Sequence, residues 1–377
     1  MSIDMYLPAF PSIAKDFHVL PSAVQATLAA FTIGMGVGQL VYGPLSDQFG
    51  RKKNLIFGMV LYAVASALCA AAPSAFGMTA LRFIQGLGGC AGMVLSRAIV
   101  RDTFSADDSA KVFSAMMLVM GVAPILAPSV GGLILEHFHW RFIFWLLSAL
   151  GVVALVNVLF FLPESLPPSR RVPSALRHSF RTYFRILKDR EFVGYALSSG
   201  MVSAGMFSYI ATSSFVFIKH YHFSEREYAL FFGLNAVGLI TASQMNRLFL
   251  KRFTSDQILG AGLNFYLVNA LLLLLFTWTD WFGIYGLVIP LFLAISCVGL
   301  SNPNATAGAM RKHGSHAGSA SALLGTLMFG SGTLGALIQS ALKGETALFM
   351  SAQIAICAIL AWSLFRFFVH RTQKART

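Results

Sequence analysis

The sequence predicts an all-α integral membrane protein in which about eleven complete helices cross the bilayer. Only 11% of the 377 residues are charged, whereas a soluble domain carries about 25% charged residues. The apolar residues make up 56% of the chain, and they lie in repeated blocks of about 20, the length that crosses a bilayer as a helix. A soluble protein does not tolerate so much exposed apolar surface.

Apolar segments identified as spanning helices follow one another along the chain, and a shorter segment precedes them. They cover about residues 22–42, 54–72, 76–100, 112–135, 141–162, 192–218, 228–248, 257–278, 282–310, 319–342 and 346–369. The preceding residues, 1–14, look like the outer end of a further helix. Ten residues reach only about 15 Å as helix, half a bilayer. We therefore expect the chain to begin inside its first spanning helix, through a misplaced start codon or a real truncation.

Basic residues predict the orientation of the helices. Most of them lie in alternate gaps between apolar blocks, as in Arg51-Lys52-Lys53, and the other gaps hold few. Because cytoplasmic loops of membrane proteins carry an excess of Lys and Arg, the basic gaps and the C-terminus are assigned to the cytoplasm. The net charge of +13 therefore reflects orientation, and we expect no nucleic-acid partner.

The longest polar stretch, residues 163–191, divides the chain into an N-terminal bundle (1–162) and a C-terminal bundle (192–377). It holds four prolines, among them Pro167, Pro168 and Pro173, and seven basic residues. Part of it is a basic amphipathic segment with Leu176, Phe180, Phe184 and Leu187 on one face. Faint similarity between the two halves indicates related bundles, as in transporters built from parallel repeats. Two bundles of equal size require twelve helices, which again places an incomplete helix at the start.

The gap after the first complete span carries a specific motif, Gly43-Pro-Leu-Ser-Asp-Gln-Phe-Gly-Arg-Lys-Lys. Glycines permit a tight turn, and Asp47 can cap the next helix or pair with a base. Gly43, Asp47, Gly50 and Arg51 resemble the cytoplasmic loop motif of the major facilitator superfamily, although Gln48 replaces a frequent arginine. The resemblance implies a latch between bundles. The alternative, an ordinary basic loop, explains the bases but not the Gly and Asp spacing.

Arg82 lies near the start of the third complete span, followed by Gln85 and Gly86. An arginine within hydrocarbon costs at least about 2.5 kcal/mol unless it is paired or hydrated. In the superfamily that Arg82, Gln85 and Gly86 resemble, an arginine at this spacing faces the central cavity and is linked to proton transfer. The alternative is that Arg82 extends to the outer headgroups, because it lies close to the helix start.

Prolines and glycines mark the fourth complete span, Ala123-Pro-Ile-Leu-Ala-Pro-Ser-Val-Gly-Gly. Prolines break backbone hydrogen bonds in a spanning helix, and small residues permit close helix contact. Pro124, Pro128, Gly131 and Gly132 resemble the signature of drug:proton antiporters, with Ala127 in place of the usual glycine. The alternative is a packing kink with no bearing on transport direction.

Four more stretches narrow the resemblance to the Bcr/CflA type of drug:proton antiporter. They are Ser2-Ile-Asp-Met-Tyr-Leu-Pro-Ala, Leu162-Pro-Glu-Ser, Asn302-Pro-Asn-Ala-Thr-Ala and Ala317-Gly-Ser-Ala-Ser-Ala-Leu-Leu-Gly. The resemblance runs from Ile3 to about Leu342. It implies export of hydrophobic antibiotics of the bicyclomycin, sulfonamide or phenicol type, and a monomer.

Asp4 is the acid that this interpretation places at membrane depth. A low-dielectric cavity disfavours the charged form of an acid, so Asp4 is expected to bind and release a proton. The family resemblance implies the same role, with Arg82 tuning Asp4. The alternative is that Asp4 is an ordinary surface carboxylate at a frayed, hydrated terminus.

Other polar and aromatic residues within the spans are candidates for the substrate cavity, although most such residues form helix–helix contacts. The cavity candidates are Tyr6, Tyr42, Gln85, Tyr209 and Asn302. No nucleotide-binding loop or hydrolase motif occurs, so we expect neither an enzyme nor a cofactor. The H-x-H pairs at His137 and His220 are too unspecific to predict a metal site.

The sequence thus predicts a proton-coupled secondary exporter of amphipathic antibiotics or other xenobiotics, in the bacterial inner membrane, that works by alternating access. Its expected partners are the drug, protons and the lipid bilayer. Two alternatives stay open. One is a proton-coupled importer of a small metabolite, and the other is a truncated membrane protein that does not transport.

Overall fold

The computed structural model describes residues 1–377 except 105, 172–174, 314–316, 342–345 and 371–377, and leaves out further side chains within α5, α7, α12 and the end of η5. The elements of the described residues are helices of the α, 3₁₀ and π types. Their bounds are η1 Leu7–Ala9, α1 Phe10–Asp16, α2 Pro21–Phe49, α3 Arg51–Ala70, α4 Ala75–Thr103, α5 Ala106–His137, α6 Arg141–Phe161, η2 Pro168–Arg170, α7 Ala175–Ile186, α8 Arg190–Ser214, η3 Phe215–His220, α9 Glu225–Phe249, α10 Ser255–Thr279, α11 Ile284–Met310, α12 Ala317–Ala341, α13 Ala347–Leu364 and η5 Phe365–His370.

Each predicted span falls on one long helix, and in two spans the α-helix continues into a π-helical segment, α8 into η3 and α13 into η5, so the all-α membrane fold is confirmed. Within the described residues, 10 helices are long and apolar enough to cross a bilayer. The remaining predicted span corresponds to α5, which has 32 residues. α2 is longer than predicted, because it continues through Pro44 to Phe49. Gly43 therefore lies inside a helix, and the turn that was predicted around both glycines is reduced to Gly50, whose φ is 99°.

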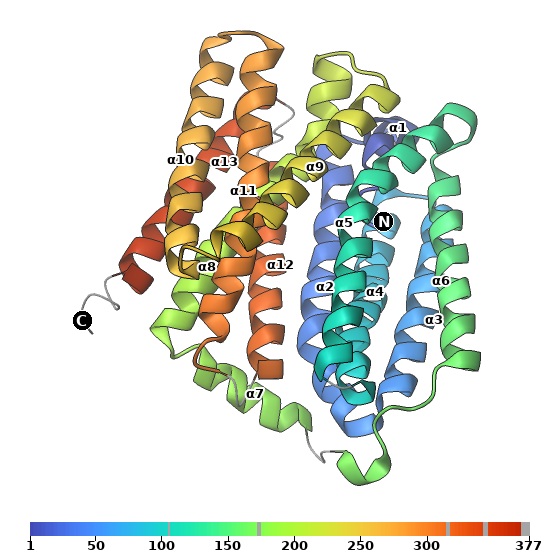
Figure 1. Cartoon of the computed structure of the whole chain (residues 1–377). Helices are drawn as coiled ribbons and strands as arrows, with labels where there is room; N and C mark the ends of the chain where they lie inside the picture. The colour runs from blue at the N-terminus through green and yellow to red at the C-terminus, as the bar shows by residue number, and fades with distance from the viewer. Residues whose placement is uncertain (105, 172–174, 314–316, 342–345, 371–377) are drawn as a thin grey trace.

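The helices form two groups joined by α7 (Figure 1). α2 to α6 pack against one another, as do α8 to α13. α7 runs across the lower end of the molecule, beneath both groups, where it contacts α2 and α12. This lower end carries Arg51, Arg311 and the bases of α7, and is called the basic end below; the opposite end is called the far end.

α7 lies in the predicted amphipathic segment, and its apolar residues face two different surroundings; the side chain of Leu176, on the predicted apolar face, lies outside the described residues. Tyr183 and Ile186 are buried, and the Tyr183 hydroxyl donates to the Leu40 carbonyl, 3.3 Å away. Phe180 and Phe184 are exposed, the latter by 68%. Apolar side chains exposed beside arginines are typical of a helix lying in the plane of a membrane surface.

The outward surfaces of both groups are apolar. On α3 and α6, Phe57 and Phe160 are exposed by 61% and 77%. Water would oppose this exposure, but hydrocarbon does not, since lipid chains solvate such side chains as well as a protein interior does. The chain is therefore a multi-pass integral membrane protein.

The two groups meet along α2 with α12 and along α5 with α9. In the first seam, Thr32 Oγ1 and Thr333 Oγ1 share a hydrogen bond of 2.7 Å. The Thr326 hydroxyl donates to the Gly36 carbonyl, 3.0 Å away. Backbone and small polar groups thus lie close together across the seam, the arrangement that allows helices to associate within a membrane.

The N-terminal residues pack between the groups at the far end. The expected outer helix end is instead a turn, the single 3₁₀ turn η1 and the short α1. Tyr6 and Phe10 are fully buried, so this segment is not a hydrated, frayed end. The Phe10 ring lies 6.0 Å from the Phe215 ring of the other group, and the Tyr6 ring lies 5.7 Å from that of Phe144. These contacts join the groups at the far end.

An ion pair fixes three helix ends on the same side. Asp16 Oδ2, at the end of α1, accepts hydrogen bonds from Arg141 Nη1 at 2.6 Å and from Trp140 Nε1 at 3.2 Å. Arg141 Nη2 also donates to the Ala72 carbonyl after α3. Partial burial opposes ionisation of Asp16, but the hydrogen bonds from Arg141 and Trp140 outweigh it, and the pKa of Asp16 lies below its usual range.

Replacing Asp16→Asn is expected to lower stability at pH 7 by about 0–1 kcal/mol, since the pair is partly exposed. A lowered pKa contributes stability above the unfolded pKa of about 3.9 and loses it as the pH falls through the folded value. Thermal unfolding in detergent should therefore separate the variant from the wild type at pH 7 and merge the two in acid. Glu136→Gln, an exposed carboxyl at the same end, is the control. A difference in stability between Asp16→Asn and the wild type that persists in acid would contradict this account.

Candidate functional site

The site is built around Arg82, a guanidinium on α4 that is 0% exposed. Its Nη2 donates to the Ser2 carbonyl at 3.0 Å, and its Nη1 donates to Gln85 Oε1. These bonds replace part of the hydration that the charge loses in the membrane. Arg82 therefore points into the protein and does not extend to the outer headgroups.

Aromatic rings cover the same guanidinium. Its Cζ lies 4.3 Å from the ring centroids of both Tyr6 and Phe31. Such cation–π contacts contribute about 2 kcal/mol or more each when they are desolvated. Together with the hydrogen bonds, they hold the positive charge in one place between the N-terminal segment, α2 and α4.

Gln85 connects Arg82 to α3, and the hydrogen-bonded cluster of Arg82, Gln85, Ser66, Tyr62 and Ser2 is called the Arg82 centre below. Its Nε2 donates to Ser66 Oγ at 2.7 Å, and the Ser66 hydroxyl donates to the Tyr62 carbonyl. The Tyr62 hydroxyl in turn shares a hydrogen bond of 2.7 Å with Ser2 Oγ. These hydrogen bonds therefore form a ring that leads from Arg82 through Gln85, Ser66, Tyr62 and Ser2 back to Arg82. The sequence indicated Arg82 and Gln85, but not Ser2 or Ser66, because small polar residues in spans are common.

Asp4 lies beside this centre and is not part of it. Its side chain is 15% exposed, and its Oδ2 is 3.5 Å from the Met1 amino group. Within the described residues, no ion pair joins Asp4 to Arg82. The Asp4 carboxylate lies near the Tyr209 and Tyr228 hydroxyls of the other group.

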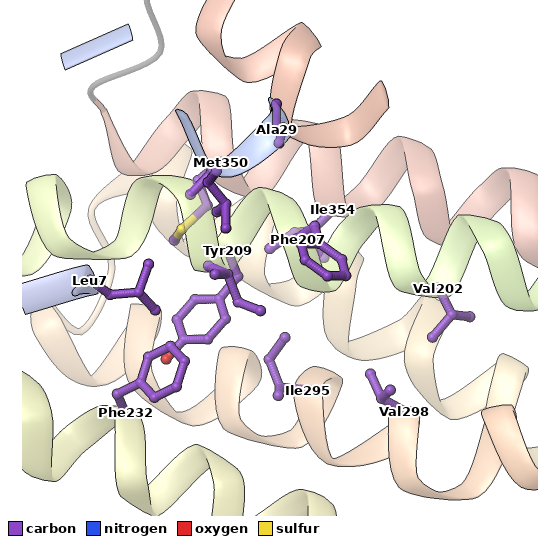
Figure 2. Packing of buried hydrophobic residues seen from close by; sticks show 14 of the residues in the cluster. Leu7, Ala29, Val202, Phe207, Tyr209, Phe232, Ile295, Val298, Met350 and Ile354 are labelled. Carbon is purple, nitrogen blue, oxygen red and sulfur yellow. The ribbon is translucent and has the colours of Figure 1, made fainter. Parts of the chain in front are cut away.

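The remaining cavity candidates, Tyr209, Tyr42 and Asn302, lie outside the group of residues around Arg82. Tyr209 is buried between the groups and stacks on Phe232, with 5.6 Å between the ring centroids, close to Leu7 (Figure 2). Tyr42 packs among apolar residues of α2, α3 and α4. Asn302 Oδ1 accepts from Ser199 Oγ at 2.8 Å, which joins α11 to α8. The structure therefore brings Tyr6 and Gln85 to Arg82, places Tyr209 near Asp4, and leaves Tyr42 and Asn302 in helix contacts.

The residues of the loop motif meet at the basic end of the first group. Arg51 is buried, and its Nε donates to Asp102 Oδ2 on α4 at 2.9 Å. Its Nη1 lies 2.6 Å from Asp47 Oδ1 and 2.5 Å from Ser46 Oγ. These contacts lie within one group of helices, so in this conformation the motif joins α2, α3 and α4 to one another.

Glu164 completes this corner, in a role that the sequence did not predict. Its carboxylate accepts from the backbone nitrogens of Arg51 at 2.9 Å and Lys52 at 3.3 Å, the first residues of α3. Gly50 has a φ of 99°, which strains any residue with a side chain, and a Cβ there would lie 2.5 Å from the Glu164 carboxylate and displace it. Glu164 thus caps α3 from the end of α6. The signal was the Leu162-Pro-Glu-Ser stretch, which resemblance alone had identified.

The glycine pair of α5 faces two different neighbours. A Cβ at Gly131 would collide with the Met5 carbonyl, whereas one at Gly132 would be 3.5 Å from the Ala229 Cβ of α9. Pro128 is buried beside them, and the side chain of Pro124 lies outside the described residues. The pair therefore lets the N-terminal segment and the second group approach α5 at the far end.

Sequence comparison identifies relatives along nearly the whole chain. A family model described as Major Facilitator Superfamily matches residues 1–336. The Bicyclomycin resistance protein homolog of Haemophilus influenzae is 33% identical over 374 residues, 99% of this chain and 94% of that protein. An uncharacterized MFS-type transporter of Bacillus subtilis, YdgK, is 36% identical over 96% of this chain and 90% of its own. Multidrug resistance protein MdtL of Escherichia coli is 31% identical over 64% of this chain and 61% of its own.

The fold also matches a solved transporter. The xylose transporter XylE from E. coli, in a partially occluded inward open conformation, superposes with a TM-score of 0.75 over 98% of this chain and 94% of its own. Its sequence is 15% identical, so this likeness concerns the fold alone.

Gly131→Ala is expected to destabilise the protein by about 1–3 kcal/mol, the usual cost of overpacking, because the new methyl group would meet the Met5 backbone. Gly132→Ala adds the same methyl group at ordinary contact distance and is the matched control. Thermal unfolding in detergent measures both. Equal stability of the two variants would show that Gly131 is not a close-contact position.

Glu164→Ala is expected to cost about 1 kcal/mol, the typical value for a lost helix cap, and Glu164→Gln less, since one acceptor oxygen remains. Glu136→Ala at the far end controls for the loss of a carboxylate. Thermal unfolding in detergent measures all three variants. If Glu164→Ala is as stable as Glu136→Ala, Glu164 does not stabilise α3 as a cap.

Proposed function

The chain belongs to the major facilitator superfamily, and within it we propose that the protein is a proton-coupled exporter of amphipathic drugs. The observation that carries this proposal is its similarity, over 99% of its length, to a protein named for bicyclomycin resistance. The similarity to MdtL, named for multidrug resistance, supports the same substrate class. The proposed substrates are hydrophobic antibiotics of the bicyclomycin, sulfonamide or phenicol type.

Proton coupling is assigned to Asp4, with Arg82 as a fixed positive charge. The Arg82 guanidinium is enclosed by hydrogen bonds and rings, so it is held in one position. Asp4 is paired with the Met1 amino group, 3.5 Å away, and lies at the junction of the two groups, near Tyr209. Acids at membrane depth mark proton relays. Asp4 is therefore the group that changes charge in the proposed cycle.

Exchange follows from competition for this carboxylate. A drug that prefers the protein with Asp4 ionised lowers the proton affinity of Asp4, and by reciprocal linkage the proton lowers the affinity for the drug. Proton entry from outside and drug entry from the cytoplasm or the inner leaflet then alternate, and the proton gradient drives the drug outwards.

The contacts between the groups support alternating access. At the far end, Phe10 meets Phe215 and Gly132 meets Ala229, both across the junction. At the basic end, the pairs Arg51–Asp102 and Arg311–Asp256 each lie within one group. We propose that this conformation is closed at the far end, and that transport requires these far-end contacts to separate as the groups rock about the α2–α12 seam.

We assign the basic end, α7 and the C-terminus to the cytoplasmic side, because cytoplasmic loops carry an excess of bases. The bacterial relatives support the proposal that the protein lies in a bacterial inner membrane. The proposed protein works as a monomer, needs no cofactor, and binds only drug, protons and lipid.

Expression in a bacterium that lacks its own drug pumps tests this function. The wild type is expected to raise resistance to at least one of the named antibiotic classes, through efflux that a proton uncoupler abolishes. Asp4→Asn is expected to return resistance to the level of the empty vector, because an amide cannot carry the proton.

Asp280→Asn, which removes an exposed carboxyl at the far end, controls for the change of charge and should keep full resistance. Uphill efflux by Asp4→Asn would remove Asp4 from the mechanism. Unchanged resistance to a broad panel with the wild type would instead favour the importer or a protein that does not transport.

A further inference from the structure

A cavity of about 370 Å³ lies at the basic end of the second group, away from the Arg82 centre. It opens between the first turns of α10 and the end of α13 with η5, the two helices at the edge of the molecule in Figure 1. Its lining residues are Thr254, Asp256, Gln257, Gly260, Ala261, Asn264, Trp362, Phe365 and Arg366. Gly260 and Ala261 keep its floor open because their side chains are small.

One wall of the cavity presents a positioned positive charge. The Arg366 guanidinium lies over the Trp362 ring, with its Cζ 4.9 Å from the centroid. The Trp362 ring is itself held by a hydrogen bond of 2.7 Å from its Nε1 to Asn264 Oδ1. In the part of the chain that the structure describes, no carboxylate lies within ion-pair distance of Arg366. Its charge is therefore available to a ligand.

The acid in the lining does not cancel this charge. Asp256 Oδ2 is 3.0 Å from Arg311 Nη2, and Asp256 Oδ1 accepts from the Tyr195 hydroxyl at 2.5 Å. The positive end of the α10 dipole and the exposed Lys251 and Arg252 before it add to the field. The cavity thus favours an anion.

The surface next to the cavity favours a hydrocarbon chain. Phe265 and Val268 continue the cavity face of α10 towards the middle of the membrane, and they are exposed by 49% and 54%. Ile359, one turn before Trp362 on α13, is exposed by 45%. A tryptophan at this level is typical of the membrane–water interface. A free anion would contact only the Arg366 guanidinium, whereas a lipid would also contact the apolar surface formed by Phe265, Val268 and Ile359.

We propose that this cavity binds an anionic phospholipid, with its phosphate at Arg366 and its acyl chains along Phe265, Val268 and Ile359. Basic pockets between spanning helices at the cytoplasmic side have the chemistry that such headgroups require. The site is separate from the drug and proton pathway proposed above, and its test needs no transport.

Native mass spectrometry of the purified protein in detergent, titrated with phosphatidylglycerol or with phosphatidylcholine, measures this binding. One phosphatidylglycerol is expected to bind saturably and more tightly than phosphatidylcholine. Arg366→Gln is expected to weaken it at least about tenfold, the effect of losing one charge-assisted hydrogen bond, and Arg366→Lys to restore part of the loss. Arg247→Gln, an exposed base at the end of α9, should leave binding unchanged.

A second variant, Ala261→Phe, fills the cavity from an exposed position and is expected to abolish the selective binding while the protein still folds. Equal binding of the two lipids, or equal effects of Arg366→Gln and Arg247→Gln, would reduce the cavity to ordinary lipid contact and overturn the proposal. Competition by inorganic phosphate at the same concentration as the lipid would also overturn it, in favour of a free-anion site.

Discussion

The burial of the Arg82 charge is the constraint on which the centre of this protein depends. A guanidinium that is cut off from water within the bilayer is stable only if every neighbouring element supplies part of its solvation. Here the N-terminal segment supplies the Ser2 carbonyl and the Tyr6 ring, α2 supplies Phe31, and α4 supplies Gln85. The charge therefore fixes where the N-terminal segment lies, and with it the position of Asp4 at the junction of the groups.

Close backbone approach is the second requirement, and glycines and small polar residues meet it. Gly131 admits the Met5 backbone, and the α2–α12 seam brings Thr32 to Thr333. These contacts contain few large side chains that must be repacked when helices slide or tilt. By contrast, the ion pairs at Arg51 and Arg311 strengthen each group internally. Rigid groups that meet along a smooth seam suit a transporter that rocks as two bodies.

Much of this fold could be predicted from sequence, because blocks of about 20 apolar residues have few other stable arrangements. The course of α2 past Gly43 could not, since Pro44 usually ends a helix and here does not. Tyr42 and Asn302 show that sequence alone cannot identify which polar residues of a span line a cavity. A polar side chain within a span has the same sequence signature whether it faces a cavity or a neighbouring helix, so only the packing distinguishes them. Glu164 caps a helix more than 100 residues away in the chain, and no local pattern reveals such a partner.

Proton and drug fluxes in reconstituted vesicles test the central claim, drug–proton exchange, most directly. The purified protein would be placed in vesicles that hold a pH-sensitive dye, and drug would be added outside without any imposed gradient. The account predicts that the lumen becomes alkaline as drug enters, because each inward drug movement releases a proton outwards, and that Asp4→Asn abolishes this signal. Acidification of the lumen would show that drug and proton move together, and drug entry with no change of pH would show uncoupled transport; either result would contradict the account.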